Sequence, residues 1–320
     1  MRERVLVIRH GALGDLCLSF APFAAIRAHH PAAAITLLTT APFASLAVAS
    51  PWFDRVLVDR RPRWWQPVEM VRLGHHLRGY DRVYDLQTSA RSRRYHLFGG
   101  AAEWSGIGRR VSHPHSNPDR DRMHTLERQR EQLAVAGVPP VPVDLGWLAK
   151  APAPDVAAPF ALLIPGASPR RPAKRWPAER FGALAEMLAK RGVTPVTIGT
   201  ATESDAAATI VGACPAAIDL TGQTDIPAIA ALAARASLAV GNDTGPMHLA
   251  AAMGAPCVVL FSAESDPALT APRTPGGGWP TILRRDNLAE LSLATVAAAC
   301  EGVLDGVKPP PAPTPSSSKD

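Results

Sequence analysis

The sequence predicts an α/β protein with two Rossmann-like, doubly wound parallel-sheet domains, and three observations carry this prediction. The 320 residues exceed one ordinary core, since domains typically run to about 100–200 residues. Short β-branched runs alternate with longer amphipathic runs, a pattern typical of βα units and a parallel sheet. A proline-rich break follows Lys150, and the same alternation resumes after it. The chain is therefore expected to fold as two similar halves.

In the first half, apolar residues recur at strand spacing in short runs and at helical spacing in longer ones. Strands are expected at residues 5–8, 35–38, 56–58 and 83–85. Helices are expected at residues 15–29, 42–49, 67–77 and 123–136. These elements predict a first domain over residues 1–150.

Residues 151–159 contain three prolines, which cannot continue a helix or pair inside a sheet, so they are expected to form a linker. Strands are then expected at residues 160–164, 194–198, 238–240 and 257–260. Helices are expected at residues 177–191, 202–214, 226–234, 245–253 and 293–304. The second domain is therefore predicted over 160–305, and the Pro/Ser-rich residues 306–320 are expected to be disordered because they lack core residues.

The composition excludes several classes of protein. Apolar residues make up 47% and charged residues 19%, as in a soluble globular protein. No apolar run approaches the roughly 20 residues that span a bilayer, and the first apolar run is too short for a signal peptide. The four cysteines are scattered, which argues against disulfides or a zinc knuckle. The net charge of +6 fits an acidic substrate or an anionic membrane surface and does not by itself imply nucleic acid. We expect a cytoplasmic enzyme or binding protein.

Ligands of doubly wound domains bind beyond the carboxyl ends of the strands, so the residues that follow each strand deserve most weight. After the first strand, Gly11 and Gly14 allow a tight turn, and Asp15 stands at a helix start. Asp15 is either an ordinary N-cap or a carboxylate at the ligand site. The segment is not a dinucleotide fingerprint, since it lacks a third glycine.

Two segments of the second half are candidate anion sites. Residues 166–177 form a small-residue turn that contains Ser168 and the cationic Lys174; they bind a phosphate or form a solvated basic loop. Residues 241–250 combine a strand end, a polar turn and a helix start. There, N–H groups at Thr244 and Gly245 would form an anion site. Asp243 is a cap or a ligand contact, and His248 is a ligand contact or faces the core.

Weaker signals lie elsewhere in the first half. Gln87, Arg91 and Arg94 follow a strand end and are expected to line the side of a ligand cleft that would hold the acceptor of a transferred group. His124 and Arg128 open a helix that is expected to face the same way. The basic and aromatic residues 60–65 either contact lipid headgroups or a saccharide, or form an ordinary exposed loop.

Together these segments resemble glycosyltransferase family 9, the ADP-heptose:lipopolysaccharide heptosyltransferase family. The resemblance runs from Val5 to about Leu304. Its most specific part is Gly-Asn-Asp-Thr-Gly-Pro-Met-His-Leu-Ala at residues 241–250, and Gly14-Asp15, Lys174-x-Trp-Pro, Asp-Leu-Gln at residues 85–87 and His124-x-x-Glu-Arg128 agree with it. The resemblance implies a GT-B fold, in which two Rossmann-like domains face each other across a cleft. It also implies an inverting, metal-independent transfer of a sugar, most often heptose from ADP-heptose, onto a lipid-linked saccharide of the lipopolysaccharide inner core.

The same resemblance assigns roles to residues of this chain. It makes Asp15 the general base and Lys174 the phosphate-binding lysine. It implies a metal-independent reaction, so we expect no metal ligand and no cofactor. With the charge and composition, we also expect no nucleic-acid partner and a cytoplasmic protein that is able to make peripheral contact with the cytoplasmic face of the inner membrane. The donor-binding set that it implies is Ser168, Lys174, Asp219, Asp243, Thr244, Gly245 and His248. The acceptor-binding set is Gly14, Gln87, Arg91, Arg94, His124 and Arg128.

Two other hypotheses remain open at this point. One is a GT-B-type enzyme that acts on a nucleotide sugar without an acceptor, such as an epimerase, although the Asp15 loop on the first domain argues against it. The other is a non-catalytic module that binds a nucleotide sugar or a glycan. The basic loop and the unaligned Gly-Pro stretch at residues 272–279 leave the identity of the donor open.

Overall fold

The computed structural model describes residues 2–63, 65–108, 110–168 and 171–306. The chain divides into two compact units, Met1–Val143 and Asp144–Asp320. The division lies ahead of the expected boundary because helix α7 (Gly146–Ala149) packs against α10 (Ile226–Ala233) of the second unit. Residues 151–159, expected as a linker, thus follow an element that already belongs to the second unit. Residues 307–320, where a disordered tail is expected, lie outside the described residues.

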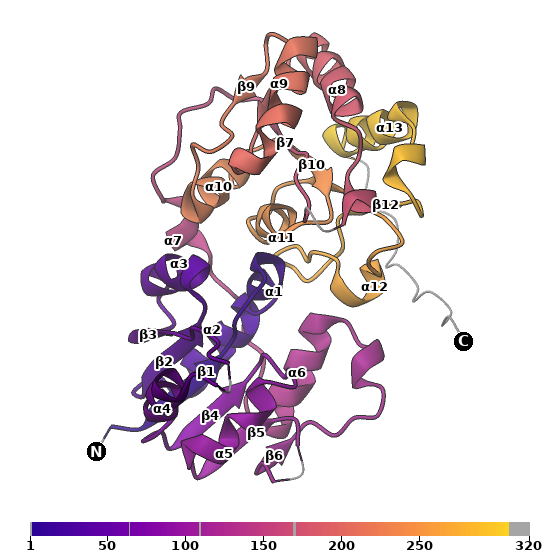
Figure 1. Cartoon of the computed structure of the whole chain (residues 1–320). Coiled ribbons are helices and arrows are strands. Elements are labelled where there is room, and N and C mark those ends of the chain that lie inside the picture. Colours follow the sequence, from indigo (N-terminus) through magenta and orange to yellow (C-terminus); the bar gives the residue numbers. More distant parts are fainter. Residues whose placement is uncertain (1, 64, 109, 169–170, 307–320) are drawn as a thin grey trace. The chain divides into compact units, whose positions relative to one another are not determined.

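The first unit is built on a parallel sheet with the strand order β3-β2-β1-β4-β5-β6 (Figure 1). Its strands are β1 (Arg4–Ile8), β2 (Ala34–Thr39), β3 (Arg55–Val58), β4 (Arg82–Asp85), β5 (Glu103–Gly106) and β6 (His113–Pro114). The order reverses between β1 and β4, which pair in parallel with Ile8 opposite Asp85. In a doubly wound sheet, the loops at such a reversal form the ligand crevice. The loops after β1 and β4 are therefore the place to look for a site.

The helices of the first unit are α1 (Leu13–Cys17), α2 (Phe20–His29), α3 (Ala44–Ala49), α4 (Pro67–His76), α5 (His96–Gly99) and α6 (Thr125–Val135). The single helix expected over residues 15–29 is two helices, α1 and α2. Pro22 has no N–H to bond to the carbonyl of Leu18, and the Ser19 hydroxyl donates to the Asp15 carbonyl at 2.8 Å. These two residues end the first helix early, so α1 is a short turn that carries Asp15.

The second unit repeats the same topology in its sheet, with the order β12-β11-β10-β7-β8-β9. Its strands are β7 (Phe160–Ile164), β8 (Thr194–Thr197), β9 (Ile218–Asp219), β10 (Leu238–Asn242), β11 (Cys257–Phe261) and β12 (Thr281–Arg284). The order reverses between β7 and β10, just as it reverses between β1 and β4. The expected pair of doubly wound parallel-sheet units is confirmed.

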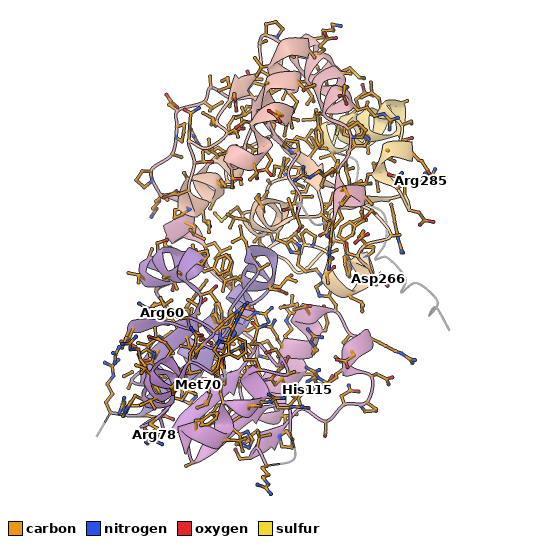
Figure 2. All side chains as sticks on the ribbon, in the orientation of Figure 1. Arg60, Met70, Arg78, His115, Asp266 and Arg285 are labelled. Atoms are coloured by element: carbon orange, nitrogen blue, oxygen red, sulfur yellow. The ribbon has the colours of Figure 1, made fainter. Side chains whose placement is uncertain are left out.

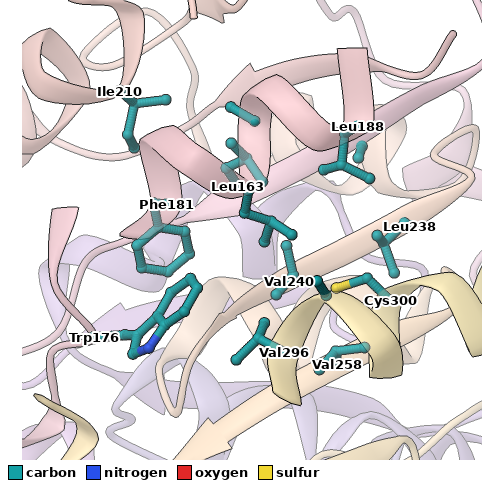
Figure 3. Close-up of a cluster of buried hydrophobic side chains, with 14 of the residues drawn as sticks. Leu163, Trp176, Phe181, Leu188, Ile210, Leu238, Val240, Val258, Val296 and Cys300 are labelled. Carbon is teal, nitrogen blue, oxygen red and sulfur yellow. The ribbon is translucent and has the colours of Figure 1, made fainter. Parts of the chain in front are cut away.

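The core of the second unit lies between this sheet and helices on one of its faces (Figure 3). The remaining helices of this unit are α8 (Ala178–Lys190), α9 (Ser204–Ala213), α11 (Gly245–Ala252), α12 (Pro267–Thr270) and α13 (Leu293–Leu304). Trp176 and Phe181 pack edge to face there, with ring centroids 4.8 Å apart. Trp176 is 2% exposed and lies two residues beyond Lys174. The candidate phosphate loop is therefore anchored in the core.

Candidate functional site

In the second unit, a cluster of charged side chains lies where the sheet order reverses. Lys174, from the loop after β7, forms an ion pair with Asp243, which follows β10. The same carboxylate accepts a hydrogen bond from the Ser265 hydroxyl at 2.6 Å, and His248 Nε2 lies 3.7 Å from Asp243 Oδ1. Lys174, Asp243 and His248 are each less than 10% exposed. The structure thus brings together three residues of the predicted donor set.

Two residues of β10 bring the two loops together. The Asn242 side chain donates to the Pro165 carbonyl at 2.7 Å and accepts the backbone N–H of Trp176 at 3.0 Å. It thereby holds both ends of the loop that carries Lys174. Gly241 allows β7 and β10 to approach, because a Cβ at this position would lie 2.6 Å from the Ile164 carbonyl oxygen. In the Gly-Asn-Asp sequence, the glycine therefore allows the strands to pack closely, the asparagine fixes the neighbouring loop, and the aspartate supplies the carboxylate.

The carboxyl group of Asp243 is strongly acidic. Burial by itself would raise its pKa, but the contacts with His248 and Lys174 outweigh burial and lower the pKa to about 2. Asp243 is therefore ionised throughout the physiological pH range. Its negative charge is matched by the Lys174 ammonium, a group that has three protons to donate.

Helix α11, which carries His248, begins two residues after Asp243. Thr244 is the N-cap, its side chain makes no capping hydrogen bond, and Gly245 and Pro246 are the first helical residues. The first N–H groups of a helix have no partner within it, and the helix dipole adds partial positive charge there. The Gly245 N–H and the Lys174 ammonium are thus two positive groups on adjoining loops. This combination can hold a diphosphate.

Two other predicted donor residues lie apart from this cluster. Ser168 is exposed on the loop after β7. Asp219 is exposed at the end of β9, the edge strand of the sheet, and its carboxylate accepts the Thr221 N–H at 2.8 Å. In the described part of the chain, neither side chain has a recorded contact with Lys174 or Asp243. Their donor-binding roles remain predictions.

In the first unit, Asp15 is not the N-cap that one interpretation of the sequence expected. Ala12 is the N-cap of α1, and Asp15 is the third helical residue. Its Oδ2 accepts the Ala12 N–H at 3.1 Å, and its Oδ1 lies 3.1 Å from the Arg9 guanidinium. The Asp15 side chain is nevertheless 43% exposed. A carboxylate that is fixed on one side and open to solvent on the other suits a general base.

A buried charged layer lies beneath Asp15. Arg9 is 3% exposed and Asp85 is fully buried. Burial raises the pKa of Asp85 to about 6, although its Oδ1 accepts the N–H groups of Gln87 and Thr88 at 3.1 and 3.0 Å. Arg9 reaches across the sheet reversal and donates to the Leu86 carbonyl at 2.9 Å. The loops after β1 and β4 are therefore tied together.

The predicted acceptor residues occupy several environments in the first unit. Gly14 is buried in α1, and the Gln87 side chain accepts the backbone N–H of His10 at 2.9 Å. His124 is the N-cap of α6 and accepts the Leu126 N–H at 3.2 Å.

The predicted acceptor arginines also differ from one another. Arg91 donates to the Pro62 carbonyl at 3.0 Å, and Arg94 is exposed. Arg128 is partly buried; burial and the nearby charges of Arg120 and Arg9 lower its pKa. Arg128 thus lies in the electrostatic field of the Asp15 site.

Several residues near these sites were not among those predicted from the sequence. Asp59, which follows β3, accepts the Tyr95 hydroxyl at 2.6 Å and lies 3.0 Å from His10 Nε2. A cavity of about 460 Å³ adjoins it and is lined by Asp59, Arg60, Arg72 and His76, among others. Arg120 donates to the Thr88 hydroxyl at 3.1 Å. Position after a strand could have identified Asp59; the partners of Arg120 depend on loops that only the fold brings together.

The comparisons with known proteins point to one family. The model of glycosyltransferase family 9 (heptosyltransferase) matches residues 70–278. Lipopolysaccharide heptosyltransferase 2 of Escherichia coli K12 is 26% identical over 313 residues, which covers 84% of this chain and 85% of that protein. The structure of E. coli ADP-heptose LPS heptosyltransferase II superposes with a TM-score of 0.73 at 23% identity, covering 96% of this chain and 99% of the other. A family 9 glycosyltransferase of Veillonella parvula reaches 0.77 at 20% identity, covering 95% and 97%.

The structural likenesses confirm the GT-B type of fold, and the family match extends over most of the chain, including the Lys174 and Asp243 loops. The epimerase and the non-catalytic binding module are thereby set aside. The chain belongs to glycosyltransferase family 9, the heptosyltransferases, and is a glycosyltransferase.

Proposed function

We propose that this protein transfers heptose from ADP-heptose onto an inner-core acceptor of lipopolysaccharide, with inversion at the anomeric carbon and with Asp15 as the general base. The observation that carries the donor half is the Lys174–Asp243 pair beside the start of α11. The relative in E. coli, a lipopolysaccharide heptosyltransferase, supports the choice of sugar and acceptor.

On the donor side, the leaving group is a nucleoside diphosphate. Lys174 would donate protons to the phosphate oxygens, and the Thr244 and Gly245 N–H groups would bind the same diphosphate at the helix start. These donors are fixed before the reaction, so they stabilise the charge that develops as the bond between the sugar and the phosphate breaks. Asp243 would hold Lys174 in place and accept a hydrogen bond from a hydroxyl of the donor sugar.

On the acceptor side, the Asp15 carboxylate would take the proton of the acceptor hydroxyl. The hydroxyl oxygen then forms a bond to the anomeric carbon, while the bond from that carbon to the phosphate oxygen breaks and its electron pair leaves with ADP. General-base catalysis of this kind contributes about 10²–10⁴-fold. The exposure of Asp15 at 43% leaves one side of the carboxylate accessible to a sugar hydroxyl.

The surroundings of Asp15 favour an anionic acceptor. Arg9 pairs with Asp15, and the positive charges of Arg120 and Arg128 lie close enough to affect one another. Arg120 is in turn paired with Asp121, and the half-buried Arg128 adds a further positive charge that raises the local concentration of a negatively charged substrate. An acidic inner-core saccharide fits this field.

A lipid-linked acceptor would bring the protein to a membrane surface, in keeping with the predicted contact with the cytoplasmic face of the inner membrane. In the described residues, no helix combines the length and hydropathy needed to cross a bilayer. Instead, Val68 and Val71 of α4 are 70% and 61% exposed, and α4 packs against α5, where Leu97 is 62% exposed. Arg78 donates to the carbonyl of Phe98 in α5 at 3.3 Å, and Figure 2 shows Arg60, Met70 and Arg78 on the left of the first unit.

We take this apolar surface with its adjoining arginines as the membrane-facing part, since apolar side chains flanked by cations bind anionic lipid. Val68→Asp with Val71→Asp should reduce co-sedimentation with anionic vesicles several-fold and leave ADP binding unchanged. Equal co-sedimentation of this variant and the wild type would contradict the assignment.

The donor is tested by a thermal-shift panel of ADP-, GDP-, UDP- and dTDP-sugars. A ligand that binds only the native state raises the melting temperature, and ADP-heptose should give the largest rise. A larger rise with another nucleotide sugar would refute the choice of donor. Mass spectrometry of truncated lipopolysaccharides, with and without heptose, then distinguishes the acceptors.

A further inference from the structure

The side chain of Arg9 is fixed by both loops at the sheet reversal of the first unit. Its Nη2 lies 3.1 Å from Asp15 Oδ1 and donates to the Asp15 backbone carbonyl at 3.0 Å. Its Nε donates to the same carbonyl at 3.3 Å, and its Nη1 donates to the Leu86 carbonyl at 2.9 Å. One guanidinium therefore holds Asp15 by its main chain and its side chain at once.

The burial of the charged Arg9 side chain opposes folding unless its lost hydration is replaced. Arg9 is 3% exposed, and burial lowers its pKa, which means that the surroundings disfavour its charge. A buried cation persists only where opposite charge and hydrogen bonds compensate for lost hydration. The compensating carboxylate in direct contact is Asp15, whose other side is open to solvent.

Asp85, the other carboxylate near Arg9, is engaged differently. Its Oδ1 accepts the N–H groups of Gln87 and Thr88, and the structure records no hydrogen bond from Arg9 to it. The planar guanidinium instead aligns its N–H groups with Asp15 and Leu86. A planar group with several fixed donors restricts a carboxylate more than a flexible ammonium would.

We infer that Arg9 is a positioning residue for the transfer reaction, which orients the Asp15 carboxylate toward the acceptor hydroxyl and anchors α1 to the loop after β4. The inference rests on the proposed role of Asp15 as the base. Arg9 acts through Asp15 and need not touch either substrate. Its loss should therefore lower kcat and leave donor binding unchanged, because the proposed donor groups all lie in the second unit.

The test uses the full-length variants Arg9→Ala and Arg9→Lys, with Ser19→Ala as a matched control. Ser19 donates to the same Asp15 carbonyl at 2.8 Å but does not contact the carboxylate. Arg9→Ala should lower kcat on the order of 10- to 100-fold, the scale expected when a reacting group is misplaced. The Kd for ADP should stay within twofold, and Ser19→Ala should keep kcat within threefold.

Two further measurements separate positioning from a merely structural role. Millimolar guanidinium should restore part of the kcat of Arg9→Ala and none of that of Asp15→Asn, and Arg9→Lys should have a higher kcat than Arg9→Ala. Folding is checked by circular dichroism and by the ADP-induced thermal shift; if Arg9→Ala does not fold, Arg9→Lys alone is compared with wild type and should lose kcat at constant Kd.

The inference is overturned if the folded Arg9 variants keep kcat within threefold of wild type, or if guanidinium and Arg9→Lys both fail to improve on Arg9→Ala. Failure of the proposed function has a different signature. Wild-type turnover by Asp15→Asn would remove the base itself, whereas an inactive Asp15→Asn beside a fully active Arg9→Ala would refute only the positioning role.

Discussion

Lys174→Met removes the cation that faces Asp243 and keeps a side chain of similar length. The pKa of Asp243 falls from 3.8 to about 2 because contacts with His248 and Lys174 outweigh burial. A pKa lowered in the folded state stabilises the fold above pH 4, and this contribution is lost as the pH falls from about 4 to 2. At 1.36 kcal/mol per pKa unit, it amounts to about 2 kcal/mol at pH 7. Lys174→Met should remove roughly half or more of it.

The same substitution should weaken nucleotide binding. A hydrogen bond between charged groups contributes about 1.5–3 kcal/mol, which corresponds to roughly 10- to 150-fold in Kd for ADP. Urea unfolding at pH 7 measures the first effect, and isothermal titration calorimetry with ADP measures the second. Turnover should fall together with affinity, because the lysine also faces the departing diphosphate.

Three variants make this prediction specific. Lys190→Met is the matched control, since Lys190 is an exposed lysine of α8 whose nitrogen lies 3.7 Å from Glu186; it should change neither quantity. Lys174→Arg keeps the charge and should retain most of the stability. Lys174→Met combined with Asp243→Asn should regain stability, because no buried charge is left unpaired. The double variant should not regain ADP binding, since the lysine is still absent. If Lys174→Met bound ADP as tightly as wild type, the phosphate-binding role would be refuted.

Three other substitutions test separate parts of the account. Asp15→Asn should lower kcat by about 10²–10⁴-fold with the ADP Kd within twofold, and stopped-assay turnover near wild type would exclude it as the base. Trp176→Ala should cost about 3–5 kcal/mol of unfolding free energy in urea titrations, because it empties a core position that anchors the Lys174 loop; a loss below 1 kcal/mol would contradict that anchoring. Asp85→Asn should stabilise the protein at pH 7 by up to about 3 kcal/mol, since burial raises the pKa of Asp85 to about 6. A raised carboxyl pKa opposes folding increasingly as the pH rises from 4 to 6, so the stability gain of Asp85→Asn should vanish near pH 4. A stability gain that does not depend on pH would refute burial of the ionised Asp85 as its cause.

The sequence predicted those parts of the structure that depend on local pattern. The alternation of short and long apolar runs indicated two domains built of βα units. The polar turns after β1, β7 and β10 indicated the candidate sites. Glu103–Gly106 and His113–Pro114 are strands β5 and β6 without an alternating or continuous apolar pattern. They pair because β4 offers an open edge, which no local signal can reveal.

Contacts across the sheet reversals were also beyond sequence reasoning. Asn242 binds Trp176 across 66 residues, and Arg9 donates to Leu86 across 77. Such pairs depend on which strands become neighbours, and that is set by topology. Of the two interpretations of Asp15, the N-cap was wrong for a related reason, since the turn at Gly11 and Ala12 starts α1 earlier than the apolar pattern indicates.

The transfer reaction itself tests the central claim most directly. Wild-type protein and Asp15→Asn are incubated with ADP-heptose and a truncated lipopolysaccharide, and the acceptor is analysed by mass spectrometry. The proposed function predicts that wild type adds one heptose and releases ADP, while Asp15→Asn binds ADP-heptose and adds almost none. Wild-type protein that binds ADP-heptose but adds no heptose to any inner-core acceptor would contradict the claim.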